Sequence, residues 1–282
     1  PRDERITRRS GASAHGGQQT DAQIANGERK QMKPWLVFFD IDGTLLFPGG
    51  ISPQNLRAID RLRADGHKVF INTGRSRAMM LHALPPGLHM DGYVCGSAYV
   101  EYGGRVLHNS LVDDETVRAV CRYVAAHNER LCLEGVDKLY TIGDVGMIGT
   151  VDMTRSLEKY LADPAKLKVT KLTFFDPLPA DFDARFPALR RIEFATYAEG
   201  IQQGYSKATG MALLCEKLGV PRARTAAFGD SENDIEMLDY AAKSVIMHHA
   251  PASLDAHAAL RTDGDEDGVA EGIEKLFYGE KP

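Results

Sequence analysis

Two aspartates follow a short apolar segment near residue 40. The segment is Trp35–Phe39, and Asp40, Asp42 and Gly43 come after it. Because it is too short for a helix, it predicts a buried strand, and alternation along that strand would point both carboxylates the same way if it continued. A divalent cation would neutralise two such carboxylates, and Mg²⁺ prefers oxygen ligands. The alternative is a strand that ends in an Asx-turn with both aspartates solvated.

A second apolar segment also ends in residues that could do chemistry. Lys68–Ile71 is followed by Asn72, Thr73, Gly74 and Arg75. A helical pattern separates the two segments, so they predict a parallel strand–helix–strand unit. If the strands are neighbours, the Thr73 hydroxyl and the Gly74 N–H lie beside the aspartates and could donate to a phosphate oxygen. Thr73 could instead cap the helix that follows.

Two later segments carry charged side chains at the ends of expected elements. The segment Thr225–Phe228 predicts another buried strand, and the letters G-D-S-E-N-D follow at 229–234. Lys207 stands at the start of a helix. Taken alone, Lys207 is an ordinary surface lysine, and Asp234 is either a helix cap or a member of the same site as Asp230.

Composition limits the kinds of partner that the chain could have. The net charge is −5, and acidic and basic residues are interspersed, so neither a nucleic-acid nor a membrane partner is expected. No apolar run approaches the roughly 18 residues that span a bilayer. The four cysteines lack zinc-site spacing, which predicts free buried thiols in a reducing cytoplasm.

Differences in composition and apolar pattern divide the chain into three regions. Residues 1–31 contain few large apolar side chains and predict a disordered tail. Residues 32–84 and 200–282 alternate strand and helix, which predicts one doubly wound parallel α/β sheet. Residues 85–199 have more hairpin character and predict an inserted α+β domain. No oligomeric state follows from these patterns.

Four pieces together resemble a known family. They are D-I-D-G-T at 40–44, T-G-R at 73–75, Lys207 and G-D-S-E-N-D at 229–234. Their order and spacing resemble the haloacid dehalogenase superfamily, and the long insertion resembles its Cof-type branch, which carries a type IIB α/β cap. The resemblance implies a Rossmann-like core with an inserted cap, covering the chain from about Met32 onward.

The resemblance also implies roles for individual residues. Asp40 would be the nucleophile that forms an aspartyl-phosphate, and Asp42 would protonate the leaving group and then activate water. Thr73 and Lys207 would hold the transferring phosphoryl group. Mg²⁺ would be bound by a side-chain oxygen of Asp40, by the main-chain carbonyl of Asp42 and by Asp230. Further contacts would come from Asp234 near the metal, and from Gly74, Arg75 and Asn233 near the substrate. Arg75 could equally form a structural ion pair.

Three functions compete on this basis. The first is a Mg²⁺-dependent phosphatase of a small phosphorylated metabolite such as a sugar phosphate, the second is a sugar phosphomutase, and the third is a catalytically silent phosphate-binding regulatory module. Substrate choice would lie in the cap, around 134–138 and 172–175. Cof-type chains usually have G-N-A and N-G turns where this chain has His248-His249-Ala250 and Gly96-Ser97. We expect neither departure to touch the chemistry.

Overall fold

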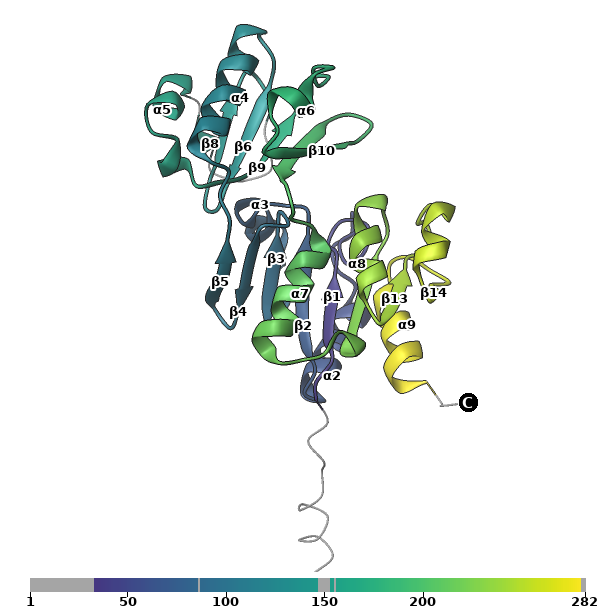
Figure 1. The fold of residues 1–282 in the computed structure, drawn as a ribbon. Helices are drawn as coiled ribbons and strands as arrows, with labels where there is room; N and C mark the ends of the chain where they lie inside the picture. The colour runs from purple at the N-terminus through teal and green to yellow at the C-terminus, as the bar shows by residue number, and fades with distance from the viewer. Residues whose placement is uncertain (1–32, 86, 147–152, 155, 280–282) are drawn as a thin grey trace, which may run out of the picture. The chain divides into compact units, whose positions relative to one another are not determined.

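The computed structural model describes residues 33–85, 87–146, 153–154 and 156–279, so the predicted tail 1–31 lies outside the described residues. A larger sheet of eight strands (Figure 1) has the order β14 (Leu260–Arg261), β13 (Lys243–Ile246), β12 (Thr225–Gly229), β1 (Leu36–Phe39), β2 (Lys68–Thr73), β3 (Gly92–Cys95), β4 (Tyr99–Tyr102) and β5 (Arg105–Asn109). The strands from β14 to β3 are parallel, and β4 and β5 are antiparallel to their neighbours.

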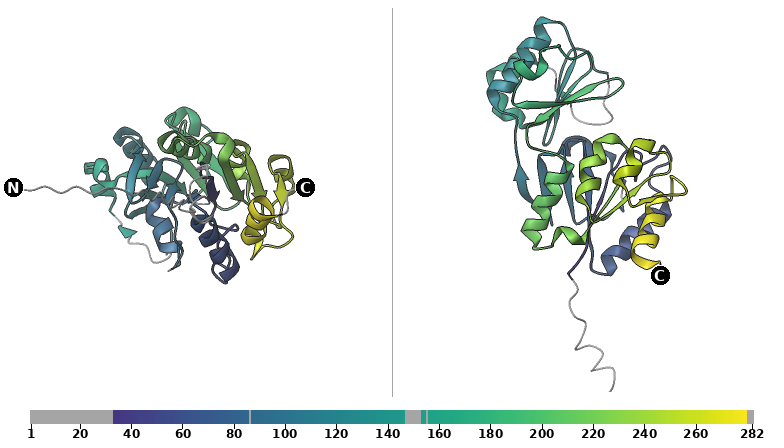
Figure 2. Two further views of the ribbon diagram at one scale, coloured as in Figure 1. Left: turned by 90° about the horizontal axis from the view of Figure 1, so that it is seen from below. Right: turned by 45° about the vertical axis from the view of Figure 1, so that its right-hand side comes forward.

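Strand β1 is apolar throughout because helices cover both faces of the sheet. Val37 and Phe39 pack in one apolar cluster with residues of α2 (Pro53–Ala64) and α9 (Gly268–Ile273). The alternate residues Leu36 and Phe38 pack in a second cluster with α7 (Lys207–Leu218) and α8 (Ile235–Tyr240). Figure 2 shows these helices on the two faces. The predicted doubly wound sheet is confirmed, and its two-sided burial explains why β1 does not alternate with polar residues.

Local capping signals define the helices of the larger sheet. The Ser52 side chain accepts from the backbone N–H of Asn55 at the start of α2. Ser206 and Thr209 form a capping box at the start of α7, and Gly219 ends that helix in the left-handed conformation at φ 62°. Short elements complete this part of the chain, namely α3 (Arg77–Ala83), η2 (Arg222–Arg224), η3 (Glu232–Asp234), η4 (Ala252–His257) and the π-helix η5 (Glu274–Tyr278).

A smaller sheet lies within the insertion. Its order is β10 (Leu189–Glu193), β11 (Ala198–Gln202), β9 (Val169–Phe174), β6 (Leu131–Gly135), β7 (Leu139–Ile142) and β8 (Met153–Thr154). All pairs are antiparallel except β7 with β8. Its helices are α4 (Asp114–Ala126), α5 (Leu157–Ala162), η1 (Pro164–Leu167) and α6 (Phe182–Arg185). We call this sheet and its helices the cap. The predicted α+β character of the insertion is confirmed.

The strand order corrects both predicted limits of the insertion, 85 and 199. Strand β3 pairs in parallel with β2, and the β4–β5 hairpin continues from β3, so residues 92–109 belong to the larger sheet. Strand β11, residues 198–202, pairs with β9 and β10 and belongs to the cap. The hairpin pattern does not identify the sheet to which these strands belong, because an antiparallel hairpin can extend the edge of a parallel sheet.

The described residues also bear on the predictions about the cysteines and about membrane spans. All four cysteines are free and buried, as predicted. None of the helices in the described part of the chain combines the length and the apolar character needed to cross a bilayer.

Substituting the central strand tests the two-sided core. Phe38 is fully buried and stacks on Phe70 with ring centroids 5.0 Å apart. Phe38→Ala is expected to lower the free energy of unfolding by about 3–5 kcal/mol, measured by urea denaturation. Val106 is 55% exposed, so Val106→Ala is expected to change it by no more than about 0.5 kcal/mol. Equal losses in the two variants would contradict this packing.

Candidate active site

The carboxyl ends of three neighbouring strands bring the predicted residues together. Strand β1 lies between β2 and β12 and is parallel to both. Asp40 follows β1, Thr73 ends β2, and Asp230 follows β12. The prediction that the first two strands are neighbours is confirmed. The chain proceeds outward from β1 to β2 and β3 on one side and from β12 to β13 and β14 on the other, so the strand order reverses between β1 and β12, which is where open α/β sheets bind ligands.

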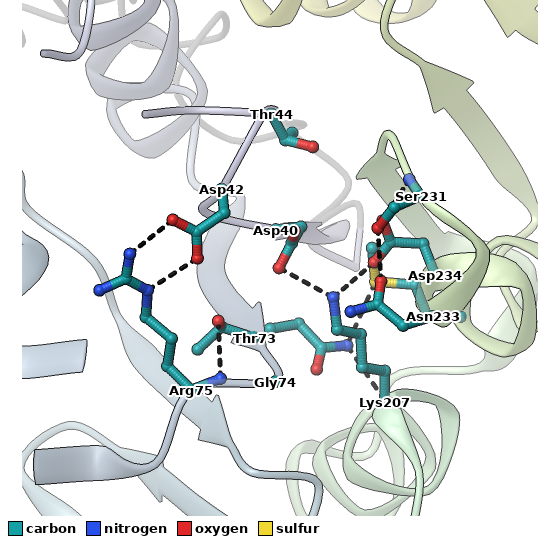
Figure 3. A network of polar contacts seen from close by, with 12 residues as sticks. Asp40, Asp42, Thr44, Thr73, Gly74, Arg75, Lys207, Ser231, Asn233 and Asp234 are labelled. Carbon is teal, nitrogen blue, oxygen red and sulfur yellow. Dashed lines mark hydrogen bonds and ion pairs between the residues drawn. The ribbon is translucent and has the colours of Figure 1, made fainter. Parts of the chain in front are cut away.

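Lys207 joins two of the aspartates. Its ammonium lies 2.8 Å from Asp40 Oδ1 and 2.5 Å from Asp234 Oδ1 (Figure 3). Burial alone would lower the pKa of Lys207, but the charges of Asp234 and Asp40 outweigh burial and raise it. Lys207 is only 3% exposed, and the side chain of Asn72 donates to its main-chain carbonyl at 3.1 Å. Lys207 is therefore a fixed positive charge, and the surface-lysine alternative is wrong.

Asp234 lies in the same cluster as Asp230, and its side chain makes no capping hydrogen bond at the start of α8. Its Oδ2 accepts from the backbone N–H groups of Asp230 at 3.0 Å and Ser231 at 3.1 Å, while its Oδ1 meets Lys207. A Cβ on Gly229 would lie 2.6 Å from the Asp234 carboxyl carbon. The absence of a side chain at Gly229 therefore leaves the space that the Asp234 carboxylate occupies.

The first motif is held against the last by Thr44 and Gly43. The Thr44 hydroxyl donates to Asp230 Oδ1 at 2.7 Å across 186 positions of sequence. Gly43 has φ +80°, and a Cβ there would lie 2.5 Å from Asp230 Oδ2. Both the left-handed turn and the close approach require glycine at this position.

Three buried carboxylates form a cluster that suits a hard divalent cation. Oxygen atoms of Asp40, Asp230 and Asp234 all lie within 4.8 Å of one another. Burial raises the pKa of Asp40 to about 7, with Lys207 opposing the rise. Burial also raises the pKa of Asp230, against the hydrogen bond from Thr44. Lys207 balances only one of the three charges, so an all-oxygen donor set with uncompensated charge remains, and it fits Mg²⁺.

The side chain of Asp42 pairs with Arg75. It is 52% exposed, and both of its oxygens are bound by the Arg75 guanidinium, at 2.6 and 2.7 Å. Strand β1 ends at Phe39 and does not continue to Asp42, so the condition under which the carboxylates of Asp40 and Asp42 would share a direction is not met. Arg75 takes its ion-pair alternative, and the hydrogen bond with Asp42 raises the pKa of Arg75.

Thr73, Gly74 and Asn233 lie on one wall of a cavity of about 540 Å³. Ser76, not Thr73, caps helix α3 by accepting from Met79 N. The Thr73 hydroxyl accepts from the backbone N–H of Arg75 at 3.1 Å, so its own proton can be donated into the cavity. Asp40, Asp42 and Asp230 line the same cavity. The cavity thus brings carboxylates and hydrogen-bond donors together, and the ammonium of Lys207 lies beside Asp40.

Comparison with known proteins identifies the family. A family model described as haloacid dehalogenase-like hydrolase matches residues 37–273. The chain belongs to the haloacid dehalogenase-like hydrolases.

Relatives and solved structures agree over most of the chain. The hydrolase is 28% identical to the Bacillus subtilis 5-amino-6-(5-phospho-D-ribitylamino)uracil phosphatase YitU, over 88% of this chain and 99% of that protein. It is 31% identical to a phosphoglycolate phosphatase of Natronomonas pharaonis, over 84% and 95%. Its fold matches the subclass IIB sugar phosphatase BT4131 with a TM-score of 0.71 at 22% identity, over 86% and 98%. The fold comparison shows that the chain shares the overall fold of that structure.

The hydrolase also has site residues that the sequence analysis did not single out. Thr44 and Asn72 are polar and fully buried, and each holds a residue of the motifs. In the cap, Lys171 and Glu199 line the cavity. Of the residues at 134–138 and 172–175 that were predicted to govern substrate choice, Glu134, Thr173 and Phe175 line it. The sequence did carry a signal for Lys171 and Glu199, because each is a charged residue within a largely apolar strand.

One departure from the family pattern does approach the chemistry. His249 Nε2 lies 3.5 Å from Asp230 Oδ2, and its Nδ1 lies 2.7 Å from Asp265 Oδ1. The expectation that the His248-His249 turn stays clear of the site is therefore wrong. The imidazole stands where it can orient the Asp230 carboxylate.

Mg²⁺ is expected to raise the thermal unfolding midpoint of the hydrolase. A ligand that binds only the folded state adds about 2.7 kcal/mol of stability at 100 times its dissociation constant. Asp230→Asn is expected to reduce the Mg²⁺-induced shift, measured by calorimetry. Asp239 pairs with His257 and is 54% exposed, so Asp239→Asn is the matched control. An equal shift in both variants would place the metal elsewhere.

Proposed function

We propose that this chain is a Mg²⁺-dependent phosphatase that hydrolyses a small phosphorylated metabolite through an aspartyl-phosphate intermediate. The observation that carries the proposal is the position of Asp40. Its carboxylate lies at the carboxyl end of the central strand, 2.8 Å from a buried lysine, and lines a cavity of about 540 Å³. A carboxylate fixed in this way is suited to in-line attack on phosphorus.

The residues around Asp40 supply donors to the transferring group. In this proposal Lys207 stabilises the negative charge on the phosphoryl oxygens, because its ammonium is buried and already in place. The Thr73 hydroxyl and the Asn233 amide donate to other phosphoryl oxygens, as does the backbone N–H of Gly74. Lys207 and Thr73 need no reorganisation during the reaction, since each is held by the contacts described above, and Asn233 is held by the Ser231 hydroxyl, which donates to its Oδ1 at 2.7 Å.

Asp40, Asp230 and Asp234 are the side chains that would hold Mg²⁺, with the Asp42 main-chain carbonyl as a further ligand. When bound, the ion would neutralise the phosphate and the carboxylate charges, which otherwise repel each other. Thr44 and the backbone N–H groups of residues 230 and 231 orient the carboxylates of Asp230 and Asp234.

Asp42 acts as general acid and base in this proposal. Its carboxylate must leave the Arg75 guanidinium to reach the leaving-group oxygen. The pair is partly exposed, with side chains 29% and 52% accessible, so breaking it costs about 1 kcal/mol or less. Arg75 thus holds Asp42 beside the cavity without preventing its release.

The volume of the cavity favours a small substrate, and the free cysteines favour a cytoplasmic enzyme. The relatives are named for a phosphoribitylamino-uracil and for phosphoglycolate, and both names describe small phosphate esters. We place the enzyme in the cytoplasm because all four cysteines are free and buried.

A phosphatase screen over sugar, nucleotide and coenzyme phosphates, with and without Mg²⁺, tests the proposal. We expect Mg²⁺-dependent phosphate release that Asp40→Asn reduces at least about 10³-fold, since the nucleophile is lost. Isomer conversion without net phosphate release would indicate a phosphomutase instead. Tight phosphate-ester binding without any turnover would indicate a silent binding module.

Asp42→Asn tests the acid–base role. The amide keeps the size of the side chain but can neither donate nor accept a proton at neutral pH, so kcat is expected to fall about 10²–10⁴-fold. Steady-state kinetics with the best substrate of the screen measure the change. Asp137 is an exposed aspartate paired with Arg77, and Asp137→Asn should retain full activity. Full activity in Asp42→Asn would remove this residue from the mechanism.

A further inference from the structure

Three charged side chains of the cap form a buried group on the wall of the cavity. Glu134 comes from β6, Lys171 from β9 and Glu199 from β11, and all three line the cavity that holds Asp40. Each is less than 9% exposed. Buried charges are costly unless they are paired, so their presence at a ligand cavity calls for a reason.

The charge of Lys171 is already engaged by the protein. Its ammonium lies 2.6 Å from Glu199 Oε1 and 3.4 Å from Glu134 Oε1, and it donates to the main-chain carbonyl of Gly74 at 2.8 Å. Burial alone would lower the pKa of Lys171, but the two glutamates outweigh burial and raise it. Two of its donors are therefore used in hydrogen bonds to the protein, and its charge is balanced by the adjacent glutamates.

The two glutamates keep acceptor capacity. Glu134 accepts from the Thr173 hydroxyl at 2.5 Å and from the Ser76 backbone N–H at 3.3 Å. Glu199 uses Oε1 for Lys171, and within the described residues its Oε2 has no hydrogen-bond partner. Because each carboxylate oxygen can accept more than one hydrogen bond, both side chains can receive hydroxyl or amino donors.

The three residues together carry a net charge of −1, from two glutamates and one lysine. The other cationic side chain that lines this cavity in the described part of the chain is Arg75, and Asp42 occupies its guanidinium, whereas Lys207 lies beside Asp40 and lines an adjoining cavity with Arg190. A second acidic group placed against Glu134 and Glu199 would therefore meet an uncompensated negative charge. Such repulsion is weakly screened in a partly buried cavity.

We propose that Glu134, Lys171 and Glu199 form a leaving-group site that selects phosphomonoesters whose organic part is rich in hydroxyl or amino donors and carries no second acidic group. The inference rests on the proposed phosphatase function. It extends that function by excluding phosphorylated carboxylic acids and bisphosphates as good substrates.

Aromatic side chains complete this site. Phe175, Phe194 and Tyr197 line the same cavity, and the last two stack with ring centroids 4.5 Å apart. Residues 194–197 form the turn between β10 and β11, closed by a backbone hydrogen bond from Phe194 N to Tyr197 O at 2.9 Å. Aromatic side chains in the same cavity as carboxylate acceptors suit the carbon face of a sugar, a polyol or a neutral ring.

The test compares substrates in matched pairs that differ by an acidic group. The pairs are glucose 6-phosphate with 6-phosphogluconate, fructose 6-phosphate with fructose 1,6-bisphosphate, and 2-hydroxyethyl phosphate with phosphoglycolate. For the wild-type enzyme with Mg²⁺, kcat/KM is expected to be at least about tenfold higher for the first member of each pair, as expected for one uncompensated charge at an effective dielectric constant of about 20.

Glu199→Gln makes the three residues neutral while it keeps the shape of the side chain. The preference within each pair is expected to shrink by about tenfold, mainly through a lower KM for the acidic substrate. Glu134→Gln is a second variant with the same expected direction, and thermal unfolding establishes that each variant is folded. Glu115 is exposed in the first turn of α4, and Glu115→Gln should leave the preference unchanged.

The outcomes separate this inference from the function on which it rests. Phosphate release from acidic and neutral partners at equal kcat/KM would overturn the leaving-group site and leave the phosphatase intact. An unchanged preference in both folded glutamine variants would also overturn it. Absence of hydrolysis of every ester, with the wild type equal to Asp40→Asn, would overturn the phosphatase and this inference with it.

Discussion

The buried ion pairs of Lys207 with Asp40 and Asp234 are the interaction on which the site depends. Lys207 is the first residue of α7, Asp40 follows the central strand, and Asp234 belongs to the turn after β12. Removing one partner of a buried pair typically costs about 3–5 kcal/mol, because the other charge stays buried without compensation. The network therefore aligns three elements with each other and also prepares a charged pocket for chemistry.

The remaining contacts of the site make sense as consequences of that alignment. With Asp234 directed at Lys207, its second oxygen can accept from the backbone of residues 230 and 231, and the turn after β12 becomes rigid. Asp230 then faces the first motif, where Thr44 donates to it and Gly43 allows the close approach. Two motifs nearly two hundred positions apart thus form one cluster of carboxylate oxygen atoms. The excess negative charge of this cluster suits a cation.

The cap contains a similar buried group, in which one lysine is paired with two carboxylates. Lys171 is buried between two glutamates, and it also donates to Gly74, next to Thr73. The Ser76 backbone N–H donates in return to Glu134. The cap and the loop after β2 are thus linked by direct hydrogen bonds.

Much of the fold and most of the site could be read from local patterns. Short apolar segments marked β1, β2 and β12 because a strand covered on both faces needs no polar alternation, and Ser52, Ser206 and Gly219 marked helix ends through capping chemistry. The positions of Asp40, Thr73 and Asp230 followed, because parallel strands end at the same edge. These inferences need only the residue types and their spacing.

Tertiary structure decided the features that depend on which distant surfaces meet. A hairpin pattern is the same in either sheet, so only pairing with β2 assigns residues 92–109 to the larger one. Asp42 turns to Arg75 because the strand ends one residue before Asp40, and His249 reaches Asp230 from a loop after β13. Periodicity specifies the buried face of an element but not its neighbour, because the neighbour is chosen by packing and charge pairing across the whole chain.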